Sequence, residues 1–164
     1  SGWIRRIRVN MKIRERKLGL LFSDIARFRG IMFDQMLAED GLTHVQAFAL
    51  NHLHNRNGLT QTELAERMDV GTVTVSGLVD RLEAKGWVER RIDEKDQRAK
   101  RIWLTSKVGG IRQKMFDGID QVNDVAFEGL SDDEVDQFID MLKNAKVKLS
   151  DKLEDMGRKT LPPD

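Results

Sequence analysis

Residues 60–105 read TQTELAERMDVGTVTVSGLVDRLEAKGWVERRIDEKDQRAKRIWLT. The first part predicts a short helix that begins after Thr60, because Glu63 stands three residues later and the two can form a capping box. The segment from Asp69 to Gly71 interrupts this helix, and we expect the glycine to permit the turn. A second helix should follow at once, so the stretch begins as a helix-turn-helix.

The second predicted helix has an apolar side and a polar side. Its apolar side chains recur at i, i+3, i+4 and i+7, which predicts a stripe that packs on a core. The stripe consists of Val75, Leu78, Val79 and Leu82. The residues that face away are small, hydroxylated or methyl-bearing, and such side chains suit hydrogen bonds to base edges and contact with thymine methyl groups. Gly86 is expected to end the helix.

A charged hairpin is predicted after this helix. Residues 87–92 and 101–104 carry the β-branched and aromatic side chains typical of strands, and DEKDQRAK is turn-like. From Lys85 to Lys107 there are eight Lys or Arg and four acids, a net charge of +4. A basic projection beside a helix-turn-helix fits contact with phosphates or a minor groove. The alternative is a solvated loop beside a helix pair that binds nothing.

Four segments of the chain resemble the MarR family of bacterial winged-helix regulators. They are GLT at 41–43, LTQTELAERMDV at 59–70, LVDRLEAKGWVER at 78–90 and DEKDQRAKRIWLT at 93–105, within a resemblance that covers residues 18–155. The resemblance implies that Arg98 enters the minor groove and that Asp96 braces the wing. The chain departs from the family at Gly77, where some relatives place an arginine that contacts DNA. The candidate DNA contacts are Gln61, Thr72, Val73, Thr74, Ser76, Gly77, Arg81, Arg98 and Lys100.

Length, composition and charge limit the classes of protein. A chain of 164 residues fits one domain with a sizeable core. The absence of cysteine excludes disulfides and thiolate metal sites. No apolar run is long enough to predict a membrane span, so we expect a cytoplasmic protein. Residues 117–164 hold thirteen acids and six bases, a net charge of −7, which leaves +8 for residues 1–116. Nucleic acid should therefore meet the first two-thirds of the chain.

Long amphipathic helices are predicted on both sides of the central stretch. Apolar residues three and four apart predict a helix over 15–39 that ends near Gly41. Its apolar face consists of Leu18, Leu21, Phe22, Ile25, Phe28, Met32 and Met36. Capping boxes or caps at Thr43 with Gln46, at Ser106, and at Ser131 with Glu134 predict the starts of three more helices. The first of these should direct Val45, Phe48, Ala49 and His52 or Leu53 inward.

These elements divide the chain into regions. The predicted boundaries are a basic N-terminal extension at 1–17, dimerisation helices at 18–41 and 106–156, a winged helix-turn-helix lobe at 42–105 and a tail at 157–164. The extension has seven Lys or Arg and one acid, which favours a frayed, solvated terminus over an arm that lies on a DNA backbone. The long helices must hide their apolar faces, either within one subunit or, as the resemblance implies, in a homodimer.

Catalytic and metal sites are not predicted. The three histidines His44, His52 and His54 have no thiolate beside them, so we expect no zinc site. No nucleophile motif or Gly-rich phosphate loop is present, so we predict that the protein is not an enzyme and has no cofactor. Related regulators often bind small aromatic acids. A comparable cleft would be lined by Arg27, Phe28, Met32, His44 and Phe48, although ordinary core packing explains the same residues.

The predicted fold is mainly α with a small β-hairpin wing: a winged helix-turn-helix with long N- and C-terminal dimerisation helices. We expect a homodimeric transcription regulator, most simply a repressor, that occupies a pseudo-palindromic operator in double-stranded DNA and is released by a ligand. The alternative is a winged-helix module for protein interaction without sequence-specific DNA binding. The basic wing favours DNA, because an interaction module would more often expose an apolar patch.

Overall fold

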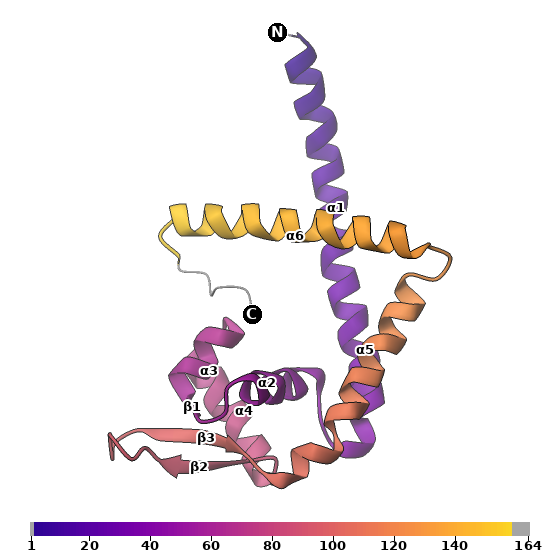
Figure 1. The fold of residues 1–164 in the computed structure, drawn as a ribbon. Coiled ribbons are helices and arrows are strands. Elements are labelled where there is room, and N and C mark those ends of the chain that lie inside the picture. The colour runs from indigo at the N-terminus through magenta and orange to yellow at the C-terminus, as the bar shows by residue number, and fades with distance from the viewer. Residues whose placement is uncertain (1, 159–164) are drawn as a thin grey trace. The chain divides into compact units, whose positions relative to one another are not determined.

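Helices make up most of the chain, which also contains one small antiparallel sheet (Figure 1). This computed structural model describes residues 2–158, with side chains from residue 17 onward. The elements are α1 (Gly2–Leu37), η1 (Ala38–Asp40), α2 (His44–Asn55), β1 (Leu59–Thr60), α3 (Gln61–Met68), α4 (Thr72–Ala84), β2 (Val88–Ile92), β3 (Lys100–Leu104), η2 (Ser106–Gly110), α5 (Arg112–Ala126) and α6 (Asp132–Asp155). The predicted fold class is confirmed. Contacts divide the chain into two units, residues 1–47 and the remainder from residue 48.

Helix α1 is longer than predicted, because it begins at Gly2 instead of near residue 15. The prediction of a frayed terminus over 1–17 is therefore wrong for the backbone from Gly2 onward. No proline or glycine interrupts residues 3–17, and Arg, Lys and Met are good helix formers, so the helix has no reason to stop there. At the other end, Gly41 adopts a left-handed conformation with φ 66° after η1, as its predicted role requires.

The buried face of α2 differs from the prediction. Ala49, His52 and Leu53 are buried as expected, but Val45 and Phe48 are 42% and 50% exposed. The buried stripe runs instead through Gln46, Ala49, Leu50 and Leu53, at i, i+3, i+4 and i+7. Hydrophobicity alone misassigned the face because the stripe opens with the polar Gln46, whose side chain accepts a hydrogen bond from the Thr43 amide in the predicted capping box.

The helix-turn-helix is formed by α3 and α4. The capping box of Thr60 and Glu63 is present, and the predicted stripe of α4 is buried, with all four side chains at most 3% exposed. The turn differs from the prediction. Asp69 holds the left-handed conformation, with φ 51°, whereas Gly71 has φ −68° and is the N-cap of α4. Asp tolerates the left-handed region better than most residues, so the turn does not need its glycine there.

The wing is part of a three-stranded sheet in the order β1-β3-β2. Sequence reasoning predicted β2 and β3 but missed β1, which has only two residues and thus no alternating pattern. β1 pairs through Leu59 with Ile102, and Gly58 just before it has φ 80°. A Cβ atom at Gly58 would lie 2.7 Å from the Trp103 ring, so this position requires glycine for both backbone and space.

The C-terminal helices begin differently from one another. Ser131 and Glu134 form the predicted capping box at the start of α6. Ser106 does not cap α5, because a 3-10 turn, η2, intervenes and α5 begins at Arg112. The hydroxyl of Thr105 instead donates to the carbonyl of Gly86 at 2.7 Å, which ties the end of the wing to the end of α4. None of the described helices has the length and apolarity to cross a membrane.

Candidate nucleic-acid interface

The first turn of α4 presents short side chains to solvent. Thr72, Val73 and Thr74 are exposed, Val73 to 86%, while Ser76 and Gly77 are half-buried. The opposite side of the helix is its buried stripe, so these residues can only face outward. Gln61 of α3 supports this turn, because its Nε2 donates to the carbonyl of Thr72 at 3.4 Å. The structure thus brings the candidate helix contacts together on one face.

Arg81 lies one turn after Gly77 and leans over it. A Cβ atom added at Gly77 would lie 3.6 Å from Nη1 of Arg81 and near no other neighbouring atom. The side chain of Arg81 is exposed. The missing side chain at residue 77 therefore leaves room for a guanidinium above the first turn of α4.

Arg90 forms ion pairs with two acids on the side of α4. Its guanidinium binds Glu83 at 2.5 Å and Asp80 at 2.6 Å, and its amide donates to Glu83 at 3.0 Å. Burial alone would lower the pKa of Arg90, but the hydrogen bonds with Asp80 and Glu83 outweigh it and raise that pKa. The two acids would otherwise repel a phosphate backbone. Their pairing with β2 also fixes the wing strand against α4.

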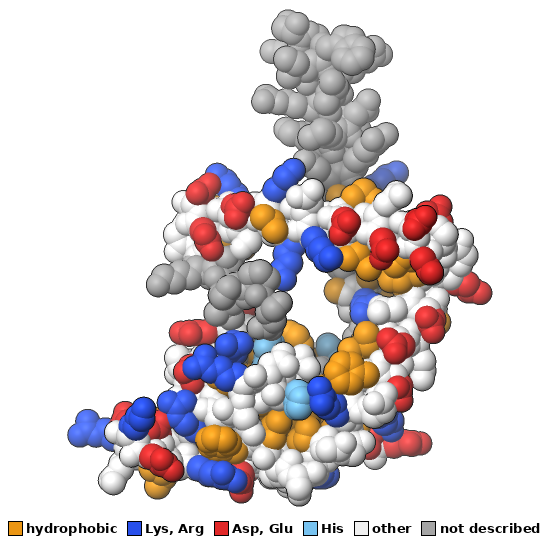
Figure 2. Space-filling model, in the orientation of Figure 1, with side chains coloured by type: hydrophobic (Ala, Val, Ile, Leu, Met, Phe, Trp, Pro, Cys, Tyr) orange, Lys and Arg blue, Asp and Glu red, His pale blue; other side chains and the backbone are white. Residues whose placement is uncertain are grey.

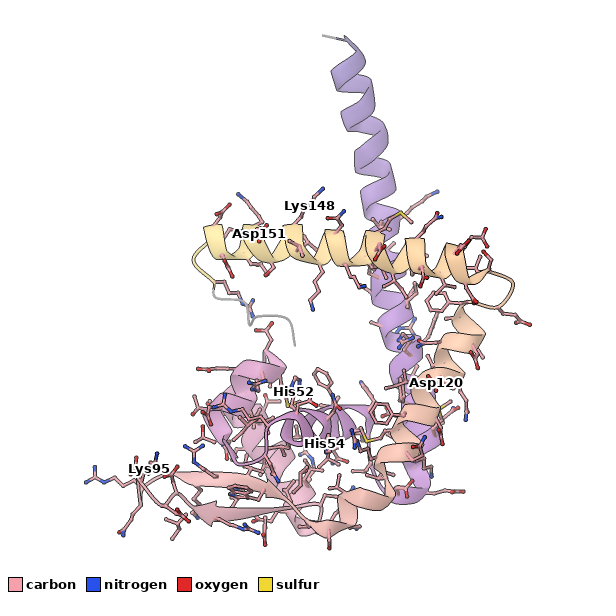
Figure 3. All side chains as sticks on the ribbon, in the orientation of Figure 1. His52, His54, Lys95, Asp120, Lys148 and Asp151 are labelled. Atoms are coloured by element: carbon pink, nitrogen blue, oxygen red, sulfur yellow. The ribbon has the colours of Figure 1, made fainter. Side chains whose placement is uncertain are left out.

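The cations of the wing fall into two groups. Arg90, Arg91 and Arg101 form ion pairs with acids of the lobe. Lys95, Arg98 and Lys100 are exposed, and within the part of the chain whose side chains are described they form no ion pair. Lys95 lies at the tip of the hairpin (Figure 3), where Lys and Arg side chains gather (Figure 2). The predicted charge of +4 is therefore available mainly at the tip, and Lys95 joins the candidate contacts that sequence reasoning named.

Two aspartates shape the wing turn. Asp96, the bracing residue that the family resemblance implies, accepts a hydrogen bond from the amide of Arg98 at 3.0 Å. The wider bracing comes from Asp93, which sequence reasoning missed. Its Oδ1 accepts from the amides of Lys95 at 2.7 Å and Asp96 at 3.1 Å, and its Oδ2 accepts from Arg101. The hydrogen bond from the Lys95 amide, followed by that from Arg101, lowers the pKa of Asp93.

The signal for Asp93 was present in the sequence. Asp93 directly follows β2 at the start of a turn, and aspartate in that position commonly accepts a hydrogen bond from the amide two residues later.

The pKa of the Glu63 carboxyl group, at the start of α3, is lowered as well. The hydrogen bond from the Thr60 amide is the largest cause that lowers the pKa of Glu63, and Arg101 adds to it.

The candidate ligand residues are only partly brought together. Arg27 binds Asp24 at 2.9 Å and lies 4.6 Å from the ring centre of Phe28 on α1, where Met32 is half-buried. The N-terminus of α2 meets α1 through His44, whose amide and Nδ1 both contact Asp34, at 2.6 Å and 2.9 Å.

Phe48 lies in the second unit and packs edge-on against His52. Both polar handles of the predicted cleft, Arg27 and His44, thus already contact an acid. Within the described side chains, no group of three or more His, Asp or Glu is placed to hold a metal ion.

The chain has a helix-turn-helix with an outward-facing second helix, and beside it a three-stranded wing with free cations at its tip. These features define a winged helix-turn-helix DNA-binding protein. Comparisons with known proteins narrow this class. A sequence model of the MarR family matches residues 40–99. The transcriptional repressor YetL of Bacillus subtilis is 30% identical over 136 residues, which cover 82% of this chain and 81% of YetL. The chain belongs to the MarR family of transcription regulators, which are not enzymes, as predicted.

Other relatives differ in how much they share. The regulator TtmR of Methylorubrum extorquens is 36% identical over 86 residues, 52% of this chain and only 44% of TtmR. The structure of the regulator SlyA has a TM-score of 0.72 and 28% identity, covering 86% of this chain and 96% of SlyA. BpsR of Bordetella bronchiseptica, whose DNA binding is regulated by 6-hydroxynicotinic acid, shares the fold at a TM-score of 0.67 and 21% identity, covering 78% of this chain and 91% of BpsR.

Proposed function

We propose that the protein acts as a homodimeric repressor whose α4 helices enter successive major grooves of a pseudo-palindromic operator, with each wing tip in the adjacent minor groove. The observation that carries this proposal is the exposure of Val73 beside Thr72 and Thr74. An apolar side chain left 86% exposed at the start of a helix-turn-helix second helix gains almost no burial within the subunit, whereas a thymine methyl group would cover it.

The two elements would divide the work of binding. Short side chains on α4, such as Ser76, reach base edges only if the helix lies deep in the major groove, so they would read sequence. Arg98 and Lys100 on the wing are long cations, suited to phosphates and to the negative potential of a narrow minor groove. Affinity would therefore come largely from the wing and specificity from α4.

Fluorescence anisotropy tests this division. The wild type, Ser76→Ala and Arg98→Ala are titrated with an inverted repeat from the promoter of the protein's own gene and with a scrambled duplex, over a range of salt. Ser76→Ala should cost about 1–3 kcal/mol on the repeat and much less on scrambled DNA. Arg98→Ala should weaken binding to both and reduce the log–log salt slope by about one unit for each subunit that contacts DNA.

Equal losses for both variants on both duplexes would show that α4 does not read sequence. If the wild type binds neither duplex, the rival function, a protein-interaction module on the same fold, replaces this one.

Dimerisation is proposed because each subunit exposes large apolar side chains on its terminal helices. They include Leu18, Leu21, Phe22, Ile25 and Phe28 on α1, Ile119 and Val125 on α5, and Met141, Val147 and Leu149 on α6. Their burial against a second copy would remove this apolar surface from water. Sedimentation velocity of Leu21→Glu with Leu149→Glu should give a monomer. Lys148→Glu, beside Leu149 and labelled in Figure 3, is the matched control and should stay dimeric.

Release by a small aromatic acid is proposed on two grounds. BpsR responds to such an acid, and Arg27 and His44 offer hydrogen-bonding groups, Arg27 over the ring of Phe28 and His44 at Asp34 of α1. A ligand carboxylate would have to replace Asp24 or Asp34 as the partner of these groups. Millimolar salicylate or 6-hydroxynicotinate should therefore weaken operator binding, and Arg27→Gln should blunt the response. Unchanged DNA affinity and unchanged protein chemical shifts would count against this ligand class.

A further inference from the structure

The side chain of Arg101 on β3 joins three elements of the lobe. Its Nε donates to Asp93 at the base of the wing turn. Its Nη1 donates to the carbonyl of Gly58 at 2.8 Å and lies 3.5 Å from Oε2 of Glu63 on α3. Guanidinium is the group suited to this task, because its planar fork can bind several acceptors at once.

Each partner of Arg101 is itself part of a local framework. Oε2 of Glu63 accepts from the Thr60 amide at 2.7 Å in the capping box that starts α3. Asp93 holds the amides of the wing turn, so that turn and the start of α3 are connected through one guanidinium. Of residues 92–101, Arg101 alone has a side chain that hydrogen-bonds outside the wing, as far as the described side chains go.

Arg91 provides a comparison inside the same sheet. It is the cross-strand partner of Arg101, so the two side chains lie on the same face of adjacent strands. Among the side chains that the structure describes, Arg91 pairs only with Glu89, two residues away, and it lies over the ring of Trp103 at 5.2 Å. Both residues carry the same charge at nearly the same place, but only Arg101 links the wing to α3.

We propose that Arg101 is a positioning residue: its bonds to Asp93, Gly58 and Glu63 set the direction of the wing turn relative to α3, and thus where Arg98 lies when α4 is in the major groove. The part of this inference that concerns DNA binding rests on the proposed function. Arg101 itself does not contact DNA in this account. Its loss removes no DNA-contacting side chain but misdirects one of them, Arg98.

The test compares Arg101→Gln with Arg91→Gln, which removes the same charge from the neighbouring strand, in the full-length protein. Asp93→Asn, the double variant Arg101→Gln with Asp93→Asn, and Arg101→Lys complete the set. Anisotropy over a range of salt gives affinity and salt slope on the promoter repeat, and amide hydrogen exchange of Lys95 and Asp96 reports the wing turn without DNA. Thermal unfolding checks that each variant is folded.

Arg101→Gln should weaken binding by about tenfold with an unchanged salt slope, since no phosphate contact is lost. Asp93→Asn should match it, and the double variant should be no worse than either, because both break one link. Arg101→Lys should recover part of the affinity. Arg91→Gln should stay within about twofold of the wild type. Only the variants of the link should speed exchange of the wing amides.

Three results would overturn the proposal. If Arg101→Gln and Arg91→Gln lose operator affinity equally, and both reduce the salt slope, Arg101 is a phosphate contact. Additive losses in the double variant would separate Arg101 from Asp93. Unchanged exchange of the wing amides in Arg101→Gln would show that the link does not position the turn. The hydrogen-exchange measurement needs no DNA, so it tests the inference even if the wild type fails to bind a duplex. If Arg101→Gln does not fold, Asp93→Asn and Arg101→Lys decide.

Discussion

Helix α4 and the wing differ in what holds them in place. The inner side of α4 is a stripe of four apolar side chains, all buried, whose burial is worth about 1.5–3 kcal/mol for each residue. The wing turn is held by hydrogen bonds and by ion pairs of half-exposed groups, such as Arg101 with Glu63, and ion pairs that water reaches contribute little to stability. The element proposed to read bases is thus rigidly seated, whereas the element proposed to bind the backbone can be redirected at low cost.

The largest effect should come from the stripe of α4. Leu82 is fully buried, so Leu82→Ala should lower the free energy of unfolding by about 2–5 kcal/mol through lost burial and a cavity. Urea denaturation measures this loss. Ala84→Ser, on the exposed side of the same helix, is the control and should change stability by less than about 0.5 kcal/mol. A small loss for Leu82→Ala would remove the proposed difference between the two elements.

A smaller effect should separate base contact from stability. Val73→Ala should cost about 1 kcal/mol of binding on the operator, from lost contact with a thymine methyl group, and should not lower the free energy of unfolding, because alanine is the better helix former. Replacing the contacted thymine by uracil should reproduce the loss in the wild type but not add to it in the variant. If the two changes are additive, Val73 does not cover that methyl group.

Gly77 should show opposite effects on stability and binding. Gly77→Ala should stabilise α4 by roughly 0.5–1 kcal/mol, because alanine is the better helix former and its Cβ would meet no atom closer than 3.6 Å. The same methyl group would stand on the outward face beneath Arg81, so operator affinity should fall. Thermal unfolding and anisotropy measure the two changes. A variant that gains both stability and affinity would place Gly77 away from the DNA.

The smallest effect should be confined to the wing at acid pH. The pKa values of Asp93 and Glu63 are lowered in the folded protein from about 3.8 and 4.5. Their contribution to stability is therefore complete above these unfolded values and is lost as pH falls through the lower folded values. Exchange of the Lys95 and Asp96 amides, corrected for intrinsic rates, should therefore speed up only below about pH 4. Exchange of the α4 amides should not change over the same pH range. If exchange speeds up equally in α4 and in the wing, the proposed difference between these two elements is wrong.

Much of the fold could be predicted where local rules and packing agree. The capping boxes at Thr60 and Ser131 and the stripe of α4 each depend on residues within one or two turns, and each is present. The outward face of α4 follows from the stripe by helix geometry, so the candidate helix contacts could be named as well.

What could not be predicted depends on partners far along the chain. β1 is too short for a pattern and exists because β3 offers it hydrogen bonds. Arg101 looked like one more basic residue until Gly58 and Glu63, distant in sequence, were placed beside it. Asp69 in the left-handed region, in place of Gly71, is a choice between neighbours of similar turn preference that local composition does not decide.

The short strand β1 also bears on the order in which the lobe folds. Its hydrogen bonds with β3, and the contact of Arg101 with Gly58, close a loop of 43 residues that contains both α3 and α4. Closing such a loop costs chain entropy, and contacts of this kind form late in folding. The two helices should therefore pack before the sheet is complete. In refolding kinetics, the fluorescence of Trp103, which lies against Gly58, should recover after helical circular dichroism does.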